Sequence, residues 1–197
     1  MQNDTVSNKL EVNKLGLGRT VRSLKFLTVF LFLMTTFMAC KGESKMRLSS
    51  TAFKDGATLP SRFTCDGNGV SPPLEWKDVP DGTQAFALIC EDPDAPNGVF
   101  THWVLYNLPR GSRELGEGLP VDEVLSIGGR QATNSFGKVG YGGACPPTGD
   151  REHRYVFKLY ALDNDIRVPA GVKKQELFDA MRNHVLAEAQ LIGKYKR

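Results

Sequence analysis

The sequence predicts a single, mainly β domain closed by a C-terminal α-helix, and two observations carry this prediction. Turn-forming combinations of proline, glycine, asparagine and aspartate recur at short intervals between residues 59 and 149. Such spacing divides a chain into short elements and favours strands over helices. Three apolar or aromatic runs of strand length lie between the turns, at 84–90, 101–108 and 153–162.

The run at 84–90 is apolar throughout, as expected of a strand buried on both faces. The runs at 101–108 and 153–162 are rich in aromatic and β-branched residues, which strands favour. The tail has a helical pattern instead, with four apolar residues at four-residue spacing: Leu177, Met181, Val185 and Ala189. We therefore expect a helix over about 173–192 that packs against the strands.

The first 39 residues differ from the rest of the chain. Basic residues precede an uncharged apolar run at 26–39, which ends in a small residue directly before Cys40. This is the layout of a secretory signal, and the run is shorter than the ~20 residues of a membrane-spanning helix. The interpretation is a lipoprotein signal at 1–39, an acylated Cys40 and a tether at 40–47. Alternatives are an uncleaved anchor and secretion with an incidental cysteine. A true start codon after about residue 18 would explain the unusual length of the stretch before the apolar run.

The net positive charge of the chain comes from these first 39 residues. The formal net charge is +3. Residues 1–39 alone carry five basic and two acidic side chains, which leaves a neutral remainder with 20 of each sign. A neutral domain has no global field that would attract nucleic acid, so anion binding would need a local site. We expect one domain at 48–197, exported and lipid-anchored to the cell envelope on its periplasmic or extracellular face.

Two histidines mark the candidate site. His102 and His153 each follow a loop rich in proline and glycine, and each begins a strand candidate. Proline fixes the backbone angle φ, and glycine permits a ligand to approach the backbone closely. Two such loops meeting at one strand end would therefore form a small preformed pocket. The third histidine, His184, is assigned no role.

Two longer motifs surround these histidines. The runs Asp92-Pro93-Asp94-Ala95-Pro96 with His102-Trp103, and Gly143 through Pro146-Pro147 to His153-Arg154-Tyr155, resemble the two signature regions of the phosphatidylethanolamine-binding proteins. The runs Thr64-Cys65-Asp66-Gly67, Ser71-Pro72-Pro73-Leu74-Glu75-Trp76 and Tyr141-Gly142-Gly143-Ala144-Cys145-Pro146-Pro147 resemble the bacterial and archaeal Raf-kinase-inhibitor-like branch. The resemblance spans about Leu48 to Arg197. It implies a Greek-key β-sandwich with a small cavity for phosphate, phosphoryl head groups or acetate-like anions.

The resemblance also implies which residues form the pocket. They are Asp92, His102, Pro147, His153 and Tyr155, with Tyr141, Asp94, Gly143 and Cys145 on the wall. The two imidazoles can donate hydrogen bonds to an anion, more strongly as the pH falls, and the Tyr155 hydroxyl adds a further donor. Asp92 is expected to orient one histidine, and the sequence leaves open which one. Arg154 alternates to the opposite strand face, where we expect it to pair with an acid.

The predicted function is non-catalytic binding of a small anionic or phosphoryl ligand, or of a phospholipid head group, without a cofactor. The alternative is a protein-interaction module such as an extracytoplasmic serine protease inhibitor. A thiol nucleophile at Cys145 is disfavoured because two prolines follow it, and no closely spaced ligand pair indicates a metal site. We therefore expect neither an enzyme nor a metal protein.

Three cysteines follow Cys40, which allows at most one disulfide. Cys90 lies in the most apolar strand and is expected to be buried. Cys65 and Cys145 both lie in loops and form the plausible pair, and the alternative is that no disulfide forms.

Overall fold

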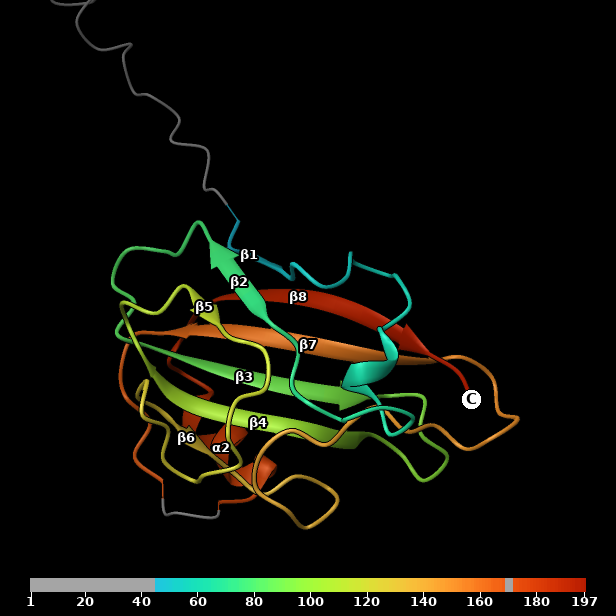
Figure 1. The fold of residues 1–197 in the computed structure, drawn as a ribbon. Coiled ribbons are helices and arrows are strands. Elements are labelled where there is room, and N and C mark those ends of the chain that lie inside the picture. The colour runs from blue at the N-terminus through green and yellow to red at the C-terminus, as the bar shows by residue number, and fades with distance from the viewer. Residues whose placement is uncertain (1–44, 169–171) are drawn as a thin grey trace, which may run out of the picture. The chain divides into compact units, whose positions relative to one another are not determined.

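Figure 1 shows the computed structural model, which describes residues 45–168 and 172–197. The signal segment, Cys40 and residues 41–44 of the tether lie outside the described residues. The elements in chain order are β1 (Arg47–Ser49), a 3₁₀ turn (Ser61–Phe63), β2 (Leu74–Lys77), β3 (Ala85–Asp92), β4 (Phe100–Pro109), β5 (Glu114–Leu115), β6 (Arg130–Gln131), β7 (His153–Leu162), α2 (Lys174–Met181) and β8 (Val185–Tyr195). Within these ranges no helix is long and apolar enough to cross a membrane.

The strands form two antiparallel sheets, which confirms the predicted β-sandwich. One sheet has the order β1-β2-β5 and the other β6-β4-β3-β7-β8. Strand β7 returns through a long connection to pair with β3, on the side opposite β4, as in a Greek key. The strands β8, β7, β3 and β4 run side by side in Figure 1.

Strand β3 is buried along its whole length because both faces of its sheet are covered. Successive side chains of a strand point to opposite faces. On one face Phe86 and Leu88 pack with Trp76 of the three-stranded sheet. On the other face Ala87 and Ile89 pack in a cluster with apolar residues of α2. Helix α2 and the three-stranded sheet therefore cover opposite faces of the five-stranded sheet.

The prediction of a helix over 173–192 is wrong in its extent. Helix α2 ends at Met181, and the chain continues as β8, which pairs antiparallel with β7 along all of β7. Burial in this segment alternates from residue to residue, as in a strand: Ala189 and Leu191 are buried, whereas Gln190 between them is exposed. Pairing with β7 satisfies the backbone hydrogen bonds and buries this alternating face, which outweighs the helical spacing.

The domain begins slightly before the predicted boundary at residue 48. Met46 is 3% exposed and belongs to the core, and Arg47 pairs with Lys77 at the start of β1. The last residues of the predicted tether are therefore part of the domain, because Met46 buries an apolar side chain between the two sheets.

Candidate ligand-binding site

The predicted site residues gather at one end of the five-stranded sheet. Asp92 is the last residue of β3, His102 lies near the start of β4, and His153 is the first residue of β7. Because β3 lies between antiparallel β4 and β7, these residues are neighbours. Tyr155 follows His153 by two residues and therefore shares its face of the sheet.

A β-bulge directs His102 toward this face. Cys90 pairs with Trp103 and the next residue, Glu91, pairs with Thr101, which leaves His102 as the extra residue of β4. A bulge turns the side chain of its extra residue away from the regular alternation. His102 consequently packs edge-on against Tyr155, with ring centroids 5.1 Å apart.

His153 lies between two carboxylates and is fully buried. Its Nδ1 is 2.7 Å from Oδ2 of Asp92, and its Nε2 is 3.2 Å from Oδ2 of Asp150. An ionised carboxylate only accepts hydrogen bonds, so contact with two carboxylates favours the form of His153 in which both ring nitrogens carry hydrogen and the imidazole is positively charged. Burial opposes this charge, but the hydrogen bonds to Asp92 and Asp150 outweigh it and raise the pKa of His153. Asp92 thus orients His153, which answers the question left open by the sequence.

His102 has the opposite electrostatic character. Its Nδ1 lies 2.8 Å from the carbonyl oxygen of Gly142, so Nδ1 carries the hydrogen and Nε2 has no hydrogen-bond partner among the described residues. Burial among aromatic rings, including Phe100 and Phe136, lowers the pKa of His102 despite the favourable contact with Gly142. At neutral pH His102 is therefore a neutral imidazole with a free acceptor nitrogen.

Tyr155 is fully buried beneath the histidines rather than on the cavity wall. Its hydroxyl finds no hydrogen-bond partner in the described part of the chain. Burial and the charge of nearby Asp92 raise the pKa of this phenol, so it stays protonated. Its predicted role as a ligand donor is not supported by contact with the cavity, and its ring instead packs against His102.

A cavity of about 320 Å³ opens between the two histidines. Five of the nine predicted site residues line it, namely Asp92, His102, Cys145, Pro147 and His153. The remaining lining residues are Ala95, Pro96, Asn97, Gly98, Val99, Phe100, Phe136 and Pro146. The Pro/Gly-rich loops that precede β4 and β7 thus supply most of the wall, as the sequence predicts.

Tyr141 and Gly143 line a neighbouring cavity of about 640 Å³ instead. The two cavities share Cys145 and the half-exposed ring of Phe136. The Tyr141 hydroxyl donates to the carbonyl oxygen of Phe63 at 2.8 Å. A Cβ atom at Gly143 would lie 3.0 Å from backbone of Thr64, so glycine is needed there for close packing of two loops. These two residues shape the wall between the cavities rather than the histidine cavity itself.

Asp94 lies outside both cavities, which corrects its predicted place on the pocket wall. Its carboxylate pairs with the guanidinium of Arg154 at 2.8 Å and with Arg151 at 3.3 Å. The hydrogen bond from Arg154 lowers the pKa of Asp94 to about 2. Arg154 alternates to the sheet face opposite His153 and draws Asp94 there, so the expected pairing of Arg154 with an acid is confirmed.

Cys65 and Cys145 form a disulfide that joins the two loops beside the cavity. Cys90 is a buried free thiol in β3. The plausible pairing inferred from the sequence is confirmed. Because its sulfur is bonded, Cys145 offers no thiol to the cavity.

Three residues of the site were missed by sequence reasoning. Asp150 contacts His153, Phe136 separates the two cavities, and Gly142 holds His102 through its carbonyl oxygen. Asp150 stands three residues before His153, and that spacing was the available signal. Phe136 lies in a loop that folds back onto β4, so no local pattern placed it at the site.

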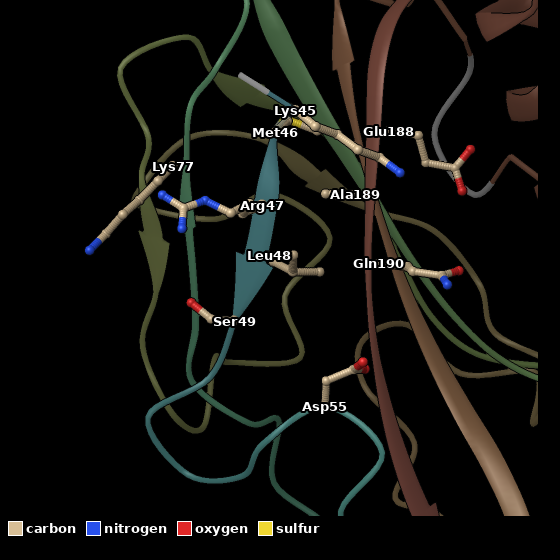
Figure 2. Close-up of a pocket in the computed structure, with 10 residues that line it drawn as sticks. All are labelled: Lys45, Met46, Arg47, Leu48, Ser49, Asp55, Lys77, Glu188, Ala189 and Gln190. Carbon is tan, nitrogen blue, oxygen red and sulfur yellow. The ribbon is translucent and has the colours of Figure 1, made fainter. Parts of the chain in front are cut away.

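A larger cavity, of about 760 Å³, lies between the edge strands β1 and β8 (Figure 2). In Figure 2 the side chain of Lys45 extends toward Glu188, whereas Arg47 and Lys77 extend on the far side of β1. Its lining combines exposed charges of both signs and contains none of the predicted site residues. The two histidines therefore define the better candidate site.

No group of three or more potential metal-ligating side chains occurs within residues 45–168 and 172–197. His153 has both nitrogens committed to carboxylates, and His102 has Nδ1 committed to a carbonyl oxygen. The arrangement is suited to hydrogen bonding with a small ligand.

Fold and site together define a β-sandwich protein with a two-histidine cavity at the end of its larger sheet. Residues 49–196 match the family model described as phosphatidylethanolamine-binding protein. The chain therefore belongs to the phosphatidylethanolamine-binding protein family.

Curated relatives and solved structures agree with this assignment. The chain is 49% identical over 152 residues to a UPF0098 protein of Methanothermobacter thermautotrophicus, covering 77% of this chain and 99% of that protein. A putative phosphatidylethanolamine-binding protein homologue of Chlamydia trachomatis, CT736, superimposes with a TM-score of 0.71 at 39% identity, covering 78% and 98% of the two chains. Escherichia coli YbcL, described as a new member of the mammalian family, gives 0.73 at 32% identity, covering 78% and 99%.

Proposed function

We propose that the protein binds a small anionic ligand, of the phosphoryl or carboxylate type, in the cavity between His102 and His153 and does not transform it. The observation that carries this proposal is the pairing of two unlike imidazoles at one cavity of about 320 Å³. His153 brings a positive charge, and His102 brings a nitrogen without a hydrogen-bond partner in the described chain. A phosphoryl head group of a lipid and a free phosphate share the chemistry that this pair recognises.

The protonation of His102 couples ligand binding to pH. At neutral pH its Nε2 accepts a hydrogen bond, so a monoprotonated phosphate can donate its own hydroxyl there. A fully ionised ligand has no such hydrogen, and His102 must first take up a proton to become a donor. Inorganic phosphate keeps a hydroxyl throughout the neutral pH range and can use the first route without taking up a proton. A ligand without a hydroxyl should bind more tightly as the pH falls below the usual histidine value near 6.5 and His102 becomes protonated.

The other side chains in the cavity and beneath it support binding rather than covalent chemistry. Nucleophilic catalysis needs an activated thiol, hydroxyl, amine or carboxylate next to a base. The sulfur of Cys145 is held in a disulfide, and the buried phenol of Tyr155 has a raised pKa. Asp92 has both carboxylate oxygens engaged, one by the backbone N–H of Asp94 and the other by His153.

Isothermal titration calorimetry of the purified full-length chain with sodium phosphate tests this proposal. His102→Asn retains an N–H that can donate to Gly142 and removes the position of Nε2. We expect about tenfold or greater weakening, because hydrogen bonds to charged groups contribute about 1.5–3 kcal/mol. The matched control is His184→Asn at an exposed histidine whose Nδ1 contacts Asp163. Equal affinity in the His102 and His184 variants would contradict the proposal, as would no binding by the wild type.

A second candidate function is a protein-interaction role, such as inhibition of an extracytoplasmic serine protease. Several large apolar side chains are exposed on loops: Val121 and Phe136, which line the second cavity, and Val124 and Ile127. Exposed apolar side chains of this kind occur at protein-binding surfaces. Dose-dependent inhibition of a protease that survives His153→Ala would favour this candidate over ligand binding.

We further propose that the chain is exported and anchored through an acylated Cys40. The support is the signal-like sequence of residues 1–39, with its basic start, its apolar run and its small residue before Cys40. An anchor there would hold the ligand-binding domain at the membrane surface.

A further inference from the structure

We propose that Asp150 is a built-in competitor of the ligand: its carboxylate occupies Nε2 of His153, and an anion must displace it to bind there. This inference rests on the proposed ligand-binding function and concerns how the same site is controlled. Nothing in the sequence motifs assigns Asp150 a role.

The two carboxylates that contact His153 are held very differently. Asp92 ends β3, its side chain is 4% exposed, and its second oxygen accepts the N–H of Asp94 at 2.8 Å. Asp150 lies in the loop before β7, its side chain is 38% exposed, and its contact with His153 is 3.2 Å long rather than 2.7 Å. Asp92 is therefore a fixed positioning group, whereas Asp150 is the carboxylate that can leave.

The surroundings of Asp150 allow it to move. Residues 147–150 form a tight turn in which the N–H of Asp150 donates to the carbonyl oxygen of Pro147 at 3.1 Å. Gly149 within this turn has a φ of +87°, a conformation that glycine adopts without strain. Apart from His153, the carboxylate of Asp150 accepts a hydrogen bond from the backbone N–H of Arg151 next to it. A side-chain rotation of Asp150 would free Nε2 while the turn itself stays in place.

The charge at the site makes this displacement necessary. His153 carries one positive charge, and Asp92 and Asp150 together carry two negative charges, so the trio has a net charge of −1. An incoming anion would be repelled by the intact trio. With Asp150 rotated into solvent, the buried pair of Asp92 and His153 has no net charge. The anion then replaces the carboxylate of Asp150 as the negatively charged acceptor at Nε2 of His153.

Competition of this kind lowers the apparent affinity of every anion by the same factor. A protein that spends only a fraction of its time in the binding-competent arrangement has an apparent Kd equal to the intrinsic Kd divided by that fraction. If Asp150 occupies Nε2 about nine-tenths of the time, removing it should tighten binding about tenfold. The gain should be similar for phosphate and for acetate, because both ligands need the same nitrogen.

The test is calorimetric titration of the full-length chain with inorganic phosphate and, separately, with acetate at physiological salt. The variants are Asp150→Ala, which removes the competing carboxylate, and Asp150→Asn, which keeps the shape and removes the charge. The matched control is Asp163→Ala, which removes the partner of His184 just beyond the other end of β7. We expect about tenfold tighter binding of both anions for Asp150→Ala, a smaller gain for Asp150→Asn and no change for Asp163→Ala.

Other outcomes would overturn the inference and can be separated from failure of the proposed function. If the wild type binds phosphate and Asp150→Ala binds it equally or more weakly, Asp150 assists the ligand or ignores it, while the proposed function stands. A gain for phosphate with none for acetate would indicate repulsion through space instead of competition for Nε2. If neither the wild type nor any variant binds either anion, both the proposed function and the competition are wrong.

Discussion

The Oδ2 atom of Asp92 lies 2.7 Å from Nδ1 of His153, and both side chains are buried at the end of the central strands β3 and β7. This contact fixes the orientation of the His153 ring and supports its positive charge. With Asp150 on the other nitrogen, it accounts for the raised pKa of a histidine whose burial alone would keep it neutral.

Asp92→Asn should destabilise the protein, and more so at low pH. A group whose pKa is raised on folding contributes fully below its unfolded value, near 6.5 for histidine, and this contribution is lost as the pH rises through the folded value. We expect a loss of about 1.5–3 kcal/mol in the free energy of unfolding at pH 6 and a smaller loss at pH 8.5. Urea denaturation of the wild type and the variant at the two pH values measures both losses. A loss that is larger at pH 8.5 would contradict a charged pair of Asp92 and His153.

Asp94→Asn should affect stability without affecting the ligand site. The pKa of Asp94 is lowered to about 2, so its contribution is present above the unfolded value near 3.9 and is lost as the pH falls toward 2. Because Arg154 is half-exposed, we expect a loss of only about 1 kcal/mol at pH 7, about half of that at pH 3 and almost none near pH 1. Phosphate titration should show unchanged affinity for Asp94→Asn and weakened affinity for Asp92→Asn. Weakened affinity for Asp94→Asn with unchanged affinity for Asp92→Asn would indicate that Asp94, and not Asp92, belongs to the ligand site.

The disulfide between Cys65 and Cys145 should contribute strongly to stability, because it spans a sequence separation of 80. In the chain-entropy account, closing a loop of this length contributes up to about 4.5 kcal/mol, and measured values are often smaller. Urea denaturation with and without reductant should reveal a loss of about 2–4 kcal/mol, and intact mass should rise by two hydrogens on reduction. An unchanged denaturation midpoint would mean that the bond does not form in solution.

Cys40→Ala should abolish lipid attachment if Cys40 is the acylated residue. Fatty-acid labelling in a bacterial host should mark the wild type, which should fractionate with membranes. The control is Cys90→Ser, because Cys90 is a buried free thiol and should not affect labelling. Equal labelling of wild type and Cys40→Ala would disprove the anchor.

The central strands could be predicted from the sequence because their local pattern agrees with their final environment. The run at 84–90 is apolar throughout since α2 and the three-stranded sheet cover both faces of β3. The tail could not be predicted in this way. Leu177 and Met181 do lie on a helix face, but the same four-residue spacing continues into β8, whose strand conformation is imposed by pairing with β7.

The site was predictable as far as its residues occupy the same end of neighbouring strands. Asp92, His102 and His153 lie together because they occupy the same end of three neighbouring strands. Asp94 was placed wrongly because its partner, Arg154, lies on the opposite sheet face and draws the carboxylate there. Asp150 and Phe136 belong to loops whose contacts depend on tertiary packing, which no periodic pattern encodes.

The central claim, that two unlike histidines bind an anion between them, is tested most directly by nitrogen NMR of the histidine side chains during phosphate titration. Without phosphate at pH 7, His153 should show two protonated ring nitrogens, and His102 should show one, at Nδ1. Added phosphate should shift Nε2 of both rings with a single saturation curve, while exposed His184 stays unchanged. Saturation that moves neither His102 nor His153, or that moves all three histidines alike, would contradict the account.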